Sequence, residues 1–311
     1  MPAIIAHALF ADHILSALRN INTPANPHSN APVVDADALH IGSQGPDIFY
    51  FHRVFPWQWG RSFSRVGLRL HDCHPAELLV AFKRYAAELP PLIESYIQGV
   101  ICHYALDCAV HPFVYAQQKA LQRLNPRYAP RANAYHYRVE SALDTLCLQR
   151  FAGLQVKNYR LQSAMPTRNK ARDLAIGQLY APLLADVLQL PDIDLALLAK
   201  APGDMRHALF WMTDRHHRRT RFIFRPMEIL SFQGHFLSSL IRPQLADDWD
   251  YANLEGREWA LGHRENFFAL FAQAQQNALR IITEYAAAPA DFDAMRAIVG
   301  DLGFDGNEVT P

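Results

Sequence analysis

The stretch His103-Tyr-Ala-Leu-Asp107-Cys-Ala-Val-His111 places a histidine, an aspartate and a second histidine at successive four-residue steps. Positions four apart lie one above the other on the same face of an α-helix, so these side chains project as a column. The residues that precede the column are strongly apolar, and burying it there without partners would cost several kcal/mol. A bound metal ion would supply the partner. Pro112 disfavours helical geometry at the residue before it, so we expect the helix to end at His111.

A second pair with the same spacing, His136 and Glu140, follows on another predicted helix. A lone histidine on an apolar helix is more often a satisfied core residue than a ligand. The two columns together instead indicate two helices that clasp a polynuclear metal centre, which favours hydrolytic chemistry.

Three further histidines are weaker candidates. His74 precedes Pro75 and is more simply interpreted as a helix cap on the surface. His52 and His40 flank the segment Gly45-Pro46-Asp47 in sequence and could touch the same site. A satisfied structural role is the more frequent one for such isolated histidines.

Composition describes a globular chain without a strong electrostatic preference. The 311 residues carry no formal net charge at pH 7, and half of them are hydrophobic, enough for a sizeable core. The zero charge gives no long-range attraction to nucleic acid or to an anionic membrane. The four cysteines lack C-x2-C spacing, so we interpret them as reduced thiols. We expect one α-helical domain over residues 1–311, with the metal ligands in about 1–150 and a helical half without ligands in about 151–311.

Apolar residues recur at helical spacing along most of the chain, whereas alternation at period two is rare. The fold class predicted from this pattern is all-α. Two segments, about 22–39 and 49–59, are rich in turn-forming or aromatic residues and are predicted to be irregular. The expected helices cover about 4–20, 76–88, 93–111, 133–151, 170–190, 202–232, 257–287 and 291–302.

The N-terminal region has none of the features of a signal peptide. It lacks a basic start and a long apolar core, and Asp12 and His13 interrupt it. No run in the sequence approaches the eighteen or so apolar residues that a transmembrane helix needs. We therefore expect a cytoplasmic protein without a transmembrane segment.

Five short elements together resemble the prokaryotic zinc-dependent phospholipase C family, which is related to secreted bacterial phospholipases C and to P1-type nucleases. They occur in the order that is typical of the family, over roughly the first 145 residues. The resemblance implies a multi-helix bundle around a polynuclear zinc site. The elements are Ala6-His7-Ala8, Gly45-Pro46-Asp47, Leu70-His71-Asp72, His103-x3-Asp107-x3-His111-Pro112 and His136-x3-Glu140.

The resemblance also implies a ligand set for two to three zinc ions per chain. A bridging carboxylate, Asp107, would be shared between the first two ions. Asp47 could be a ligand, a base that orients the attacking water, or both. The implied ligands are Asp47, His71, His103 and Asp107 for one zinc ion, Asp107 and His7 for a second, and His111, His136 and Glu140 for a third.

The leading functional hypothesis is a zinc-dependent phosphodiesterase of phospholipase C type. Closely spaced zinc ions would give a hydroxide in line with phosphorus and neutralise charge in the transition state. The substrate would be a phospholipid or another phosphodiester, met in transient contact with a membrane surface. Ile48 stands where the secreted relatives carry a tyrosine for choline, so a choline headgroup is not supported.

Two alternatives remain open at the level of sequence. The first is a P1-like nuclease or phosphomonoesterase with the same metal chemistry. Long nucleic acids normally require clustered Lys and Arg, so with zero net charge no stable nucleic acid complex is expected. The second is a non-catalytic binding domain that zinc stabilises, which would lack an open coordination position.

Overall fold

The computed structural model confirms the all-α prediction. It describes residues 4–21, 34–55, 57–124, 132–191, 193–213, 222, 226 and 248–309. Within these ranges the regular structure is helical, and β-type pairing is confined to two isolated bridges, Ala260 with His263 and Leu302 with Glu308. Among the helices that fall within the described ranges, none combines the length and apolarity needed to cross a membrane.

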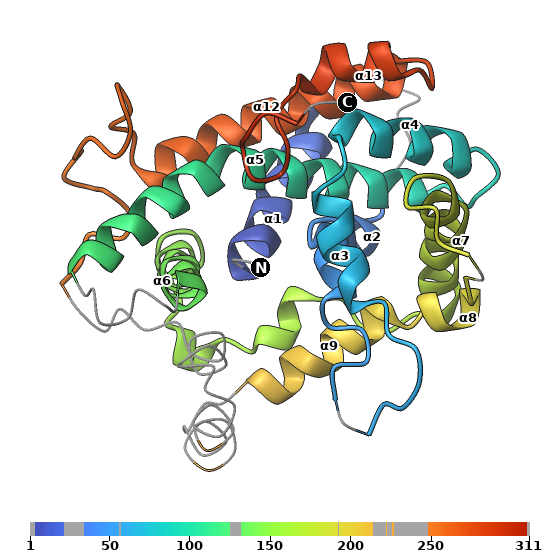
Figure 1. Ribbon diagram of the computed structural model, residues 1–311, viewed down its shortest axis with the longest axis horizontal. Coiled ribbons are helices and arrows are strands. Elements are labelled where there is room, and N and C mark those ends of the chain that lie inside the picture. The colour runs from blue at the N-terminus through green and yellow to red at the C-terminus, as the bar shows by residue number, and fades with distance from the viewer. Residues whose placement is uncertain are drawn as a thin grey trace.

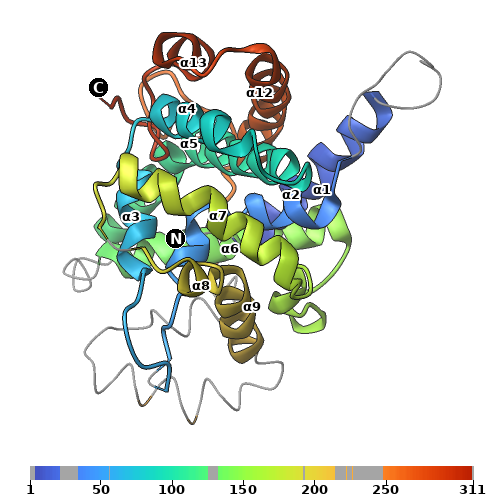
Figure 2. The same ribbon diagram turned by 90° about the vertical axis from the view of Figure 1, so that its right-hand side faces the viewer.

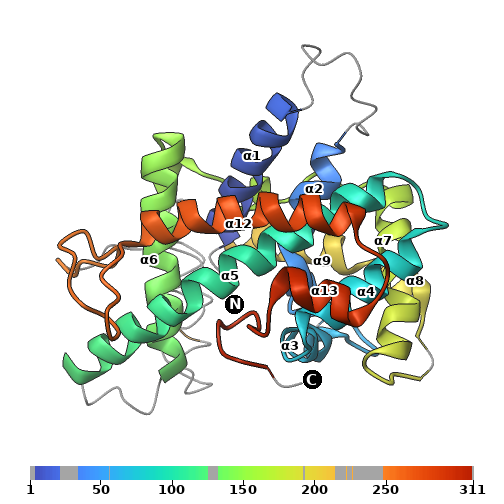
Figure 3. The same cartoon turned by 90° about the horizontal axis from the view of Figure 1, so that it is seen from above.

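The longest helix, α5 (Leu92–Leu124), crosses the whole molecule and organises the other elements around it (Figure 1). It packs against α1 (Ile4–Ile21), α2 (Ala36–Gly42), α6 (Ala132–Ala152) and α12 (Phe267–Ala287). Figure 3 shows α12 lying alongside α5, with α13 (Phe292–Val299) beside α4 (Pro75–Ala86). Because α5 carries the His103–Asp107–His111 column, the metal ligands lie at the centre of the fold.

The prediction that α5 ends at His111 is wrong, because the helix continues through Pro112 to Leu124. A proline inside a helix costs about 3 kcal/mol through its missing N–H and its ring. The residues beyond it are well buried, including Phe113, Val114 and Leu121. Full burial of one such side chain contributes roughly 1.5–3 kcal/mol, so together they outweigh the local penalty.

The close crossing of α2 and α5 depends on two glycines. A Cβ atom on Gly42 would lie 2.0 Å from the carbonyl oxygen of Tyr96, and one on Gly99 would lie 2.2 Å from that of Leu39. The helix α2 occupies the end of a segment predicted to be irregular. Asp35 starts it by accepting a hydrogen bond from the Ala38 N–H, a capping signal that the Asn- and Pro-rich context obscured.

One longer helix, α7, and several short elements complete the described fold. In Figure 2, α7 lies between α4 and the pair formed by α8 and α9. The expected helix at 257–287 begins only at Phe267, capped by Asn266, and α9 ends at Met212, after which most of the expected 202–232 helix lies outside the described residues. These elements are η1 (Gly45–Phe49), α3 (Ser64–His71), η3 (Val156–Asn158), η4 (Leu161–Ala164), α7 (Lys170–Asp186), α8 (Leu195–Leu198) and α9 (Ala201–Met212).

Candidate metal centre

The side chains predicted as ligands converge from five elements on the middle of α5. They form three groups, each with ligand atoms that lie within 4.8 Å of one another. Within the described parts of the chain, no other trio of potential ligands meets this criterion. The groups are His7, His103 and Asp107; Asp47, His71 and His103; and His111, His136 and Glu140.

The group formed by Asp47, His71 and His103 has two imidazole rings whose Nε2 atoms approach each other. The Nε2 atoms of His71 and His103 lie 3.3 Å apart, and the His71 Nε2 lies 3.5 Å from the Asp47 carboxylate. Each ring places its Nδ1 against a main-chain oxygen, that of Gly67 at 2.7 Å and that of Ser43 at 3.2 Å. A carbonyl oxygen only accepts, so Nδ1 carries the proton and Nε2 presents a lone pair in the neutral ring. Burial holds the pKa of His103 well below its usual value, which keeps that ring neutral.

The first two groups share His103, and Asp107 of the first group lies 3.9 Å from the His71 Nε2 of the second. Its Oδ1 lies 3.0 Å from the His7 Nε2, while its Oδ2 lies 3.2 Å from the His103 Nε2. The rings of His7 and His103 are stacked, with centroids 4.4 Å apart. Burial alone would raise the pKa of the Asp107 carboxyl, but the neighbouring histidines hold that pKa well below its usual value. Asp107 is therefore an ionised carboxylate whose two oxygens face different rings, as a bridging ligand requires.

The third group joins α5 to α6. The Glu140 Oε1 lies 3.1 Å from the His136 Nε2 and 3.7 Å from the His111 Nε2, and the two rings are nearly parallel. Burial opposes a charge on His111, but Asp107 and Glu140 outweigh it and raise the pKa of His111 to about 9. The same two carboxylates would attract a metal cation in place of that proton.

Several buried atoms in these groups have no hydrogen-bond partner within the described structure. The buried Nδ1 of His7, Oδ1 of Asp47 and Oε2 of Glu140 lack hydrogen bonds, although buried polar atoms almost always have one. A small cavity of about 20 Å³ lies between His7, Asp107, His111 and Glu140, enough for about one water-sized particle. Bound zinc fits this site. It would occupy the space between unpaired nitrogen and oxygen atoms and would separate the opposed lone pairs of the two Nε2 atoms.

Two supporting residues were not predicted from the sequence. Gly45 has φ of +53°, and a Cβ atom there would lie 2.3 Å from the Cδ2 of His103, so only glycine leaves room for that ring. Asp144 accepts hydrogen bonds from the Ile5 and Ala6 N–H groups at 3.1 and 2.7 Å, and so holds the start of α1 beside α6. Asp144 extends the His136–Glu140 column by four residues, and this spacing was the available signal.

The weaker histidine candidates have structural roles. His74 caps α4 by accepting from the Ala76 N–H, but it is only 2% exposed, so the prediction of a surface position is wrong. Its side chain is covered because it packs against Phe292 and faces Asp301. His52 bonds to the Leu197 carbonyl and accepts from the Phe63 N–H. His40 bonds to Asp12.

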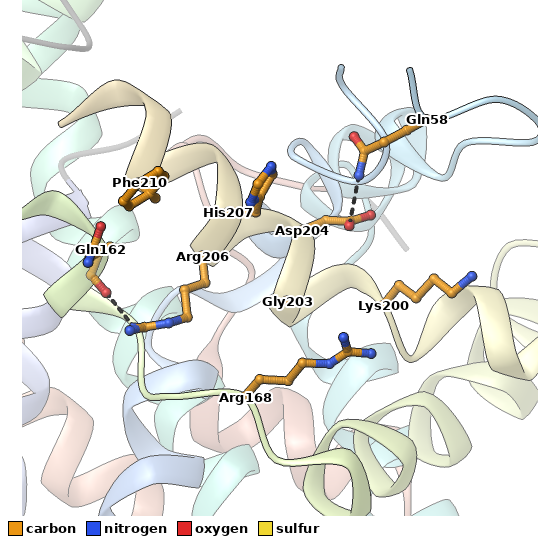
Figure 4. Close-up of a pocket in the computed structure, with 9 residues that line it drawn as sticks. All are labelled: Gln58, Gln162, Arg168, Lys200, Gly203, Asp204, Arg206, His207 and Phe210. Atoms are coloured by element: carbon orange, nitrogen blue, oxygen red, sulfur yellow. Dashed lines mark hydrogen bonds between the residues drawn. The ribbon is translucent and has the colours of Figure 1, made fainter. Parts of the chain in front are cut away.

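A larger pocket of about 510 Å³ lies elsewhere, beside α9 (Figure 4). Arg168, Lys200 and Arg206 give it a cationic lining. Its acidic residue, Asp204, accepts from Gln58 at 3.0 Å and from the Arg53 N–H. None of the lining residues belongs to the three ligand groups, so this pocket is separate from the candidate metal centre.

The fold and the site define an all-α protein with three groups of potential metal ligands around one long helix. A family model described as zinc dependent phospholipase C matches residues 6–189. The chain belongs to this family, which supports a zinc-dependent hydrolase. The match includes all the candidate ligands and ends after α7. No curated protein and no solved structure matched the chain.

Proposed function

We propose that the protein hydrolyses a phosphodiester at a centre of two to three zinc ions, held by the three ligand groups described above. The observation that carries this proposal is that one oxygen of the Asp107 carboxylate faces the Nε2 of His7 and the other faces the Nε2 of His103. A carboxylate shared in this way suits two metal ions close enough to act on one phosphate group. Two metal ions held close together are a recurring device for in-line displacement at phosphorus.

Zinc, when bound, would supply a water of lowered pKa and positive charge for the phosphoryl oxygens. The residues of the chain hold and orient the ligands. His71 and His103 are fixed by their Nδ1 hydrogen bonds to main-chain oxygens, which leaves each Nε2 directed inward. Asp47 Oδ1 is buried without a hydrogen-bond partner, and burial raises the pKa of this carboxyl. We propose Asp47 as a ligand and as the group that accepts a proton during the reaction.

The family name supports a phospholipid as substrate, with another phosphodiester as the alternative. A lipid substrate requires contact with a membrane surface. Trp57 and Trp59 are 56% and 84% exposed, and exposed tryptophans insert readily at the interface of a bilayer. We propose this pair as the contact. A shift in tryptophan fluorescence on addition of phospholipid vesicles, lost in Trp57→Ser/Trp59→Ser, would support it, and an unchanged spectrum would contradict it.

The test of the proposed function is metal content together with diesterase activity. The protein is purified without chelators or an N-terminal tag, zinc is counted by mass spectrometry, and bis-nitrophenyl phosphate, nitrophenyl phosphate and a nitrophenyl phosphocholine are offered. We expect two or three zinc ions per chain and diesterase activity that a chelator abolishes. The variant His71→Ala should lose activity, whereas His40→Ala, outside the groups, should retain it. A folded, inert protein with one zinc ion or none would instead support a binding domain.

A further inference from the structure

The chain that follows α13 turns back across α5 close to the candidate metal centre (Figures 1 and 3). We call residues Gly300–Glu308 the C-terminal segment. It lies outside the region that the family model matches, and no residue in it was predicted to serve the site. Nevertheless, it includes Phe304, which is only 3% exposed.

The C-terminal segment is shaped by its own hydrogen bonds and anchored to α5. The Gly303 N–H donates to the Asn307 carbonyl at 2.8 Å, and the Gly306 N–H donates to the Gly303 carbonyl at 3.1 Å. The hydroxyl of Tyr104 on α5 is shared between the carbonyl oxygens of Val299 and Leu302, at 3.1 and 2.9 Å. The segment is therefore a defined loop with a fixed attachment to the helix that carries the ligands.

Phe304 touches members of all three ligand groups. The His111 Nδ1 lies 3.0 Å from the main-chain oxygen of Phe304 and 3.1 Å from that of Asp107, and because carbonyls only accept, Nδ1 carries a proton that these two oxygens share. Nε2, which faces Glu140, is therefore the nitrogen whose proton a metal ion would replace. The Phe304 ring packs against His71 and His103, with centroid distances of 5.0 and 5.9 Å. One residue thus orients one histidine and covers two others.

The approach of the C-terminal segment to α5 depends on Gly306. This residue has φ of +74°, and a Cβ atom on it would lie 2.5 Å from the Cγ of Pro112 and 2.7 Å from the Cys108 carbonyl oxygen. Pro112 has no N–H to donate to that carbonyl. The segment therefore crosses α5 at its proline, where a side chain on Gly306 would push it outward.

We propose that the C-terminal segment is part of the metal centre and that Phe304 is a positioning residue for it. Its carbonyl, together with that of Asp107, holds His111 in the tautomer that binds metal through Nε2, and its ring covers His71 and His103. Partners that orient metal-ligating histidines typically change metal affinity 10- to 100-fold when they are lost. The inference rests on the proposed zinc centre and adds a region that the family match does not include.

The test compares Gly306→Ala with Gly262→Ala in the full-length protein. Both glycines have similar positive φ values, +74° and +76°, but a Cβ on Gly262 would meet nothing within 4 Å. Both substitutions therefore carry a similar cost of placing alanine at positive φ, but only Gly306→Ala displaces the C-terminal segment. Zinc is titrated against a chromophoric chelator, and the melting temperature of the metal-free protein is recorded in parallel. We expect Gly306→Ala to bind about one zinc ion at least tenfold more weakly, with Gly262→Ala unchanged.

The outcomes separate this inference from the proposed function. Wild-type protein that binds no zinc would overturn both. Zinc binding with equal affinities in wild type and Gly306→Ala would overturn only the role of the C-terminal segment, even if the metal-free melting temperature falls. If Gly306→Ala does not fold, NMR of the zinc-loaded wild type decides, with the Phe304 carbonyl carbon labelled and His111→Gln to assign the signal. A coupling across the hydrogen bond from the His111 Nδ1–H to the Phe304 carbonyl supports the inference, and an Nδ1–H that donates only to the Asp107 carbonyl overturns it.

Discussion

The Nε2 atoms of His71 and His103 lie 3.3 Å apart although both rings use Nδ1 to bond a main-chain carbonyl. When both rings are uncharged, this arrangement sets the lone pairs of the two Nε2 atoms against each other, which is unfavourable without a cation between them. The fold maintains this arrangement because the carbonyl oxygens of Gly67 and Ser43 contact the Nδ1 atoms and fix the orientation of both rings. Main-chain oxygens likewise contact the Nδ1 of His111. Substitutions that move these ligands are therefore expected to change metal binding.

The bridging position of Asp107 predicts an unequal loss of metal between two variants. Asp107→Ala removes a carboxylate that faces two groups, so we expect it to lose more than one zinc equivalent. His136→Ala affects only the third group and should lose about one. Mass spectrometry of both purified variants measures this. Loss of a single equivalent from Asp107→Ala, with activity retained, would contradict the bridged arrangement.

Gly45→Ala should damage the metal centre without changing any ligand. The new Cβ would lie 2.3 Å from the His103 ring, at a backbone φ of +53°, so the ring must move. We expect at least a tenfold loss of zinc affinity, measured by chelator competition. Gly153→Ala is the control, because Gly153 has a similar φ of +62° with nothing within 4 Å. Equal affinities in the two variants would show that His103 tolerates the displacement.

Removal of zinc should lower the thermal stability of the protein. Binding to the folded state alone stabilises by about 4 kcal/mol per site when the free metal is a thousandfold above Kd. Without it, buried carboxylates such as Glu140 lack part of their pairing. After prolonged dialysis against a chelator, we expect a melting temperature lower by several degrees, restored by zinc and not by magnesium. An unchanged melting temperature would rule out a stabilising metal at the centre.

Asp144 predicts a pH dependence of the metal-free protein. Burial raises the pKa of Asp144 to about 7 from 3.8, although the Ala6 and Ile5 N–H groups oppose this. The folded state then keeps a proton that the unfolded state releases, so stability falls as the pH rises from about 4 to about 7. The upper limit of this loss is about 4 kcal/mol.

The matched variant for this pH dependence is Asp144→Asn, which cannot ionise. Its stability relative to wild type, measured by urea denaturation at several pH values, should improve steadily across the interval from pH 4 to pH 7. A constant difference between the two proteins would mean that Asp144 does not titrate in that range. The comparison is made within one protein background, so other titrating groups cancel.

The helical spacing of His103, Asp107 and His111 could be read from the sequence because their periodicity is local. His7, Asp47 and His71 lie far from this column along the chain, and only the family resemblance joined them to it. The end of α5 was misplaced because a rule about the residue before proline is local, whereas the packing of Phe113 and Val114 that overrides it is tertiary.

The contribution of Phe304 could not be predicted in the same way. Its contact with His111 uses a main-chain oxygen, which every residue possesses, so no residue type in the sequence announces it. The contact also joins positions 193 residues apart. Such long-range main-chain contacts become visible only when the fold is known.

The burial of the ligands beneath Phe304 also governs how fast an ion could enter or leave. His7 and His103 are almost inaccessible to solvent, so exchange of an ion held by this pair requires the surrounding helices to open locally, and its rate measures that opening. An ion trapped in this way equilibrates slowly with the medium, whatever its affinity. The metal content of a sample would then record the conditions in which the chain folded, more than the buffer in which it is later assayed.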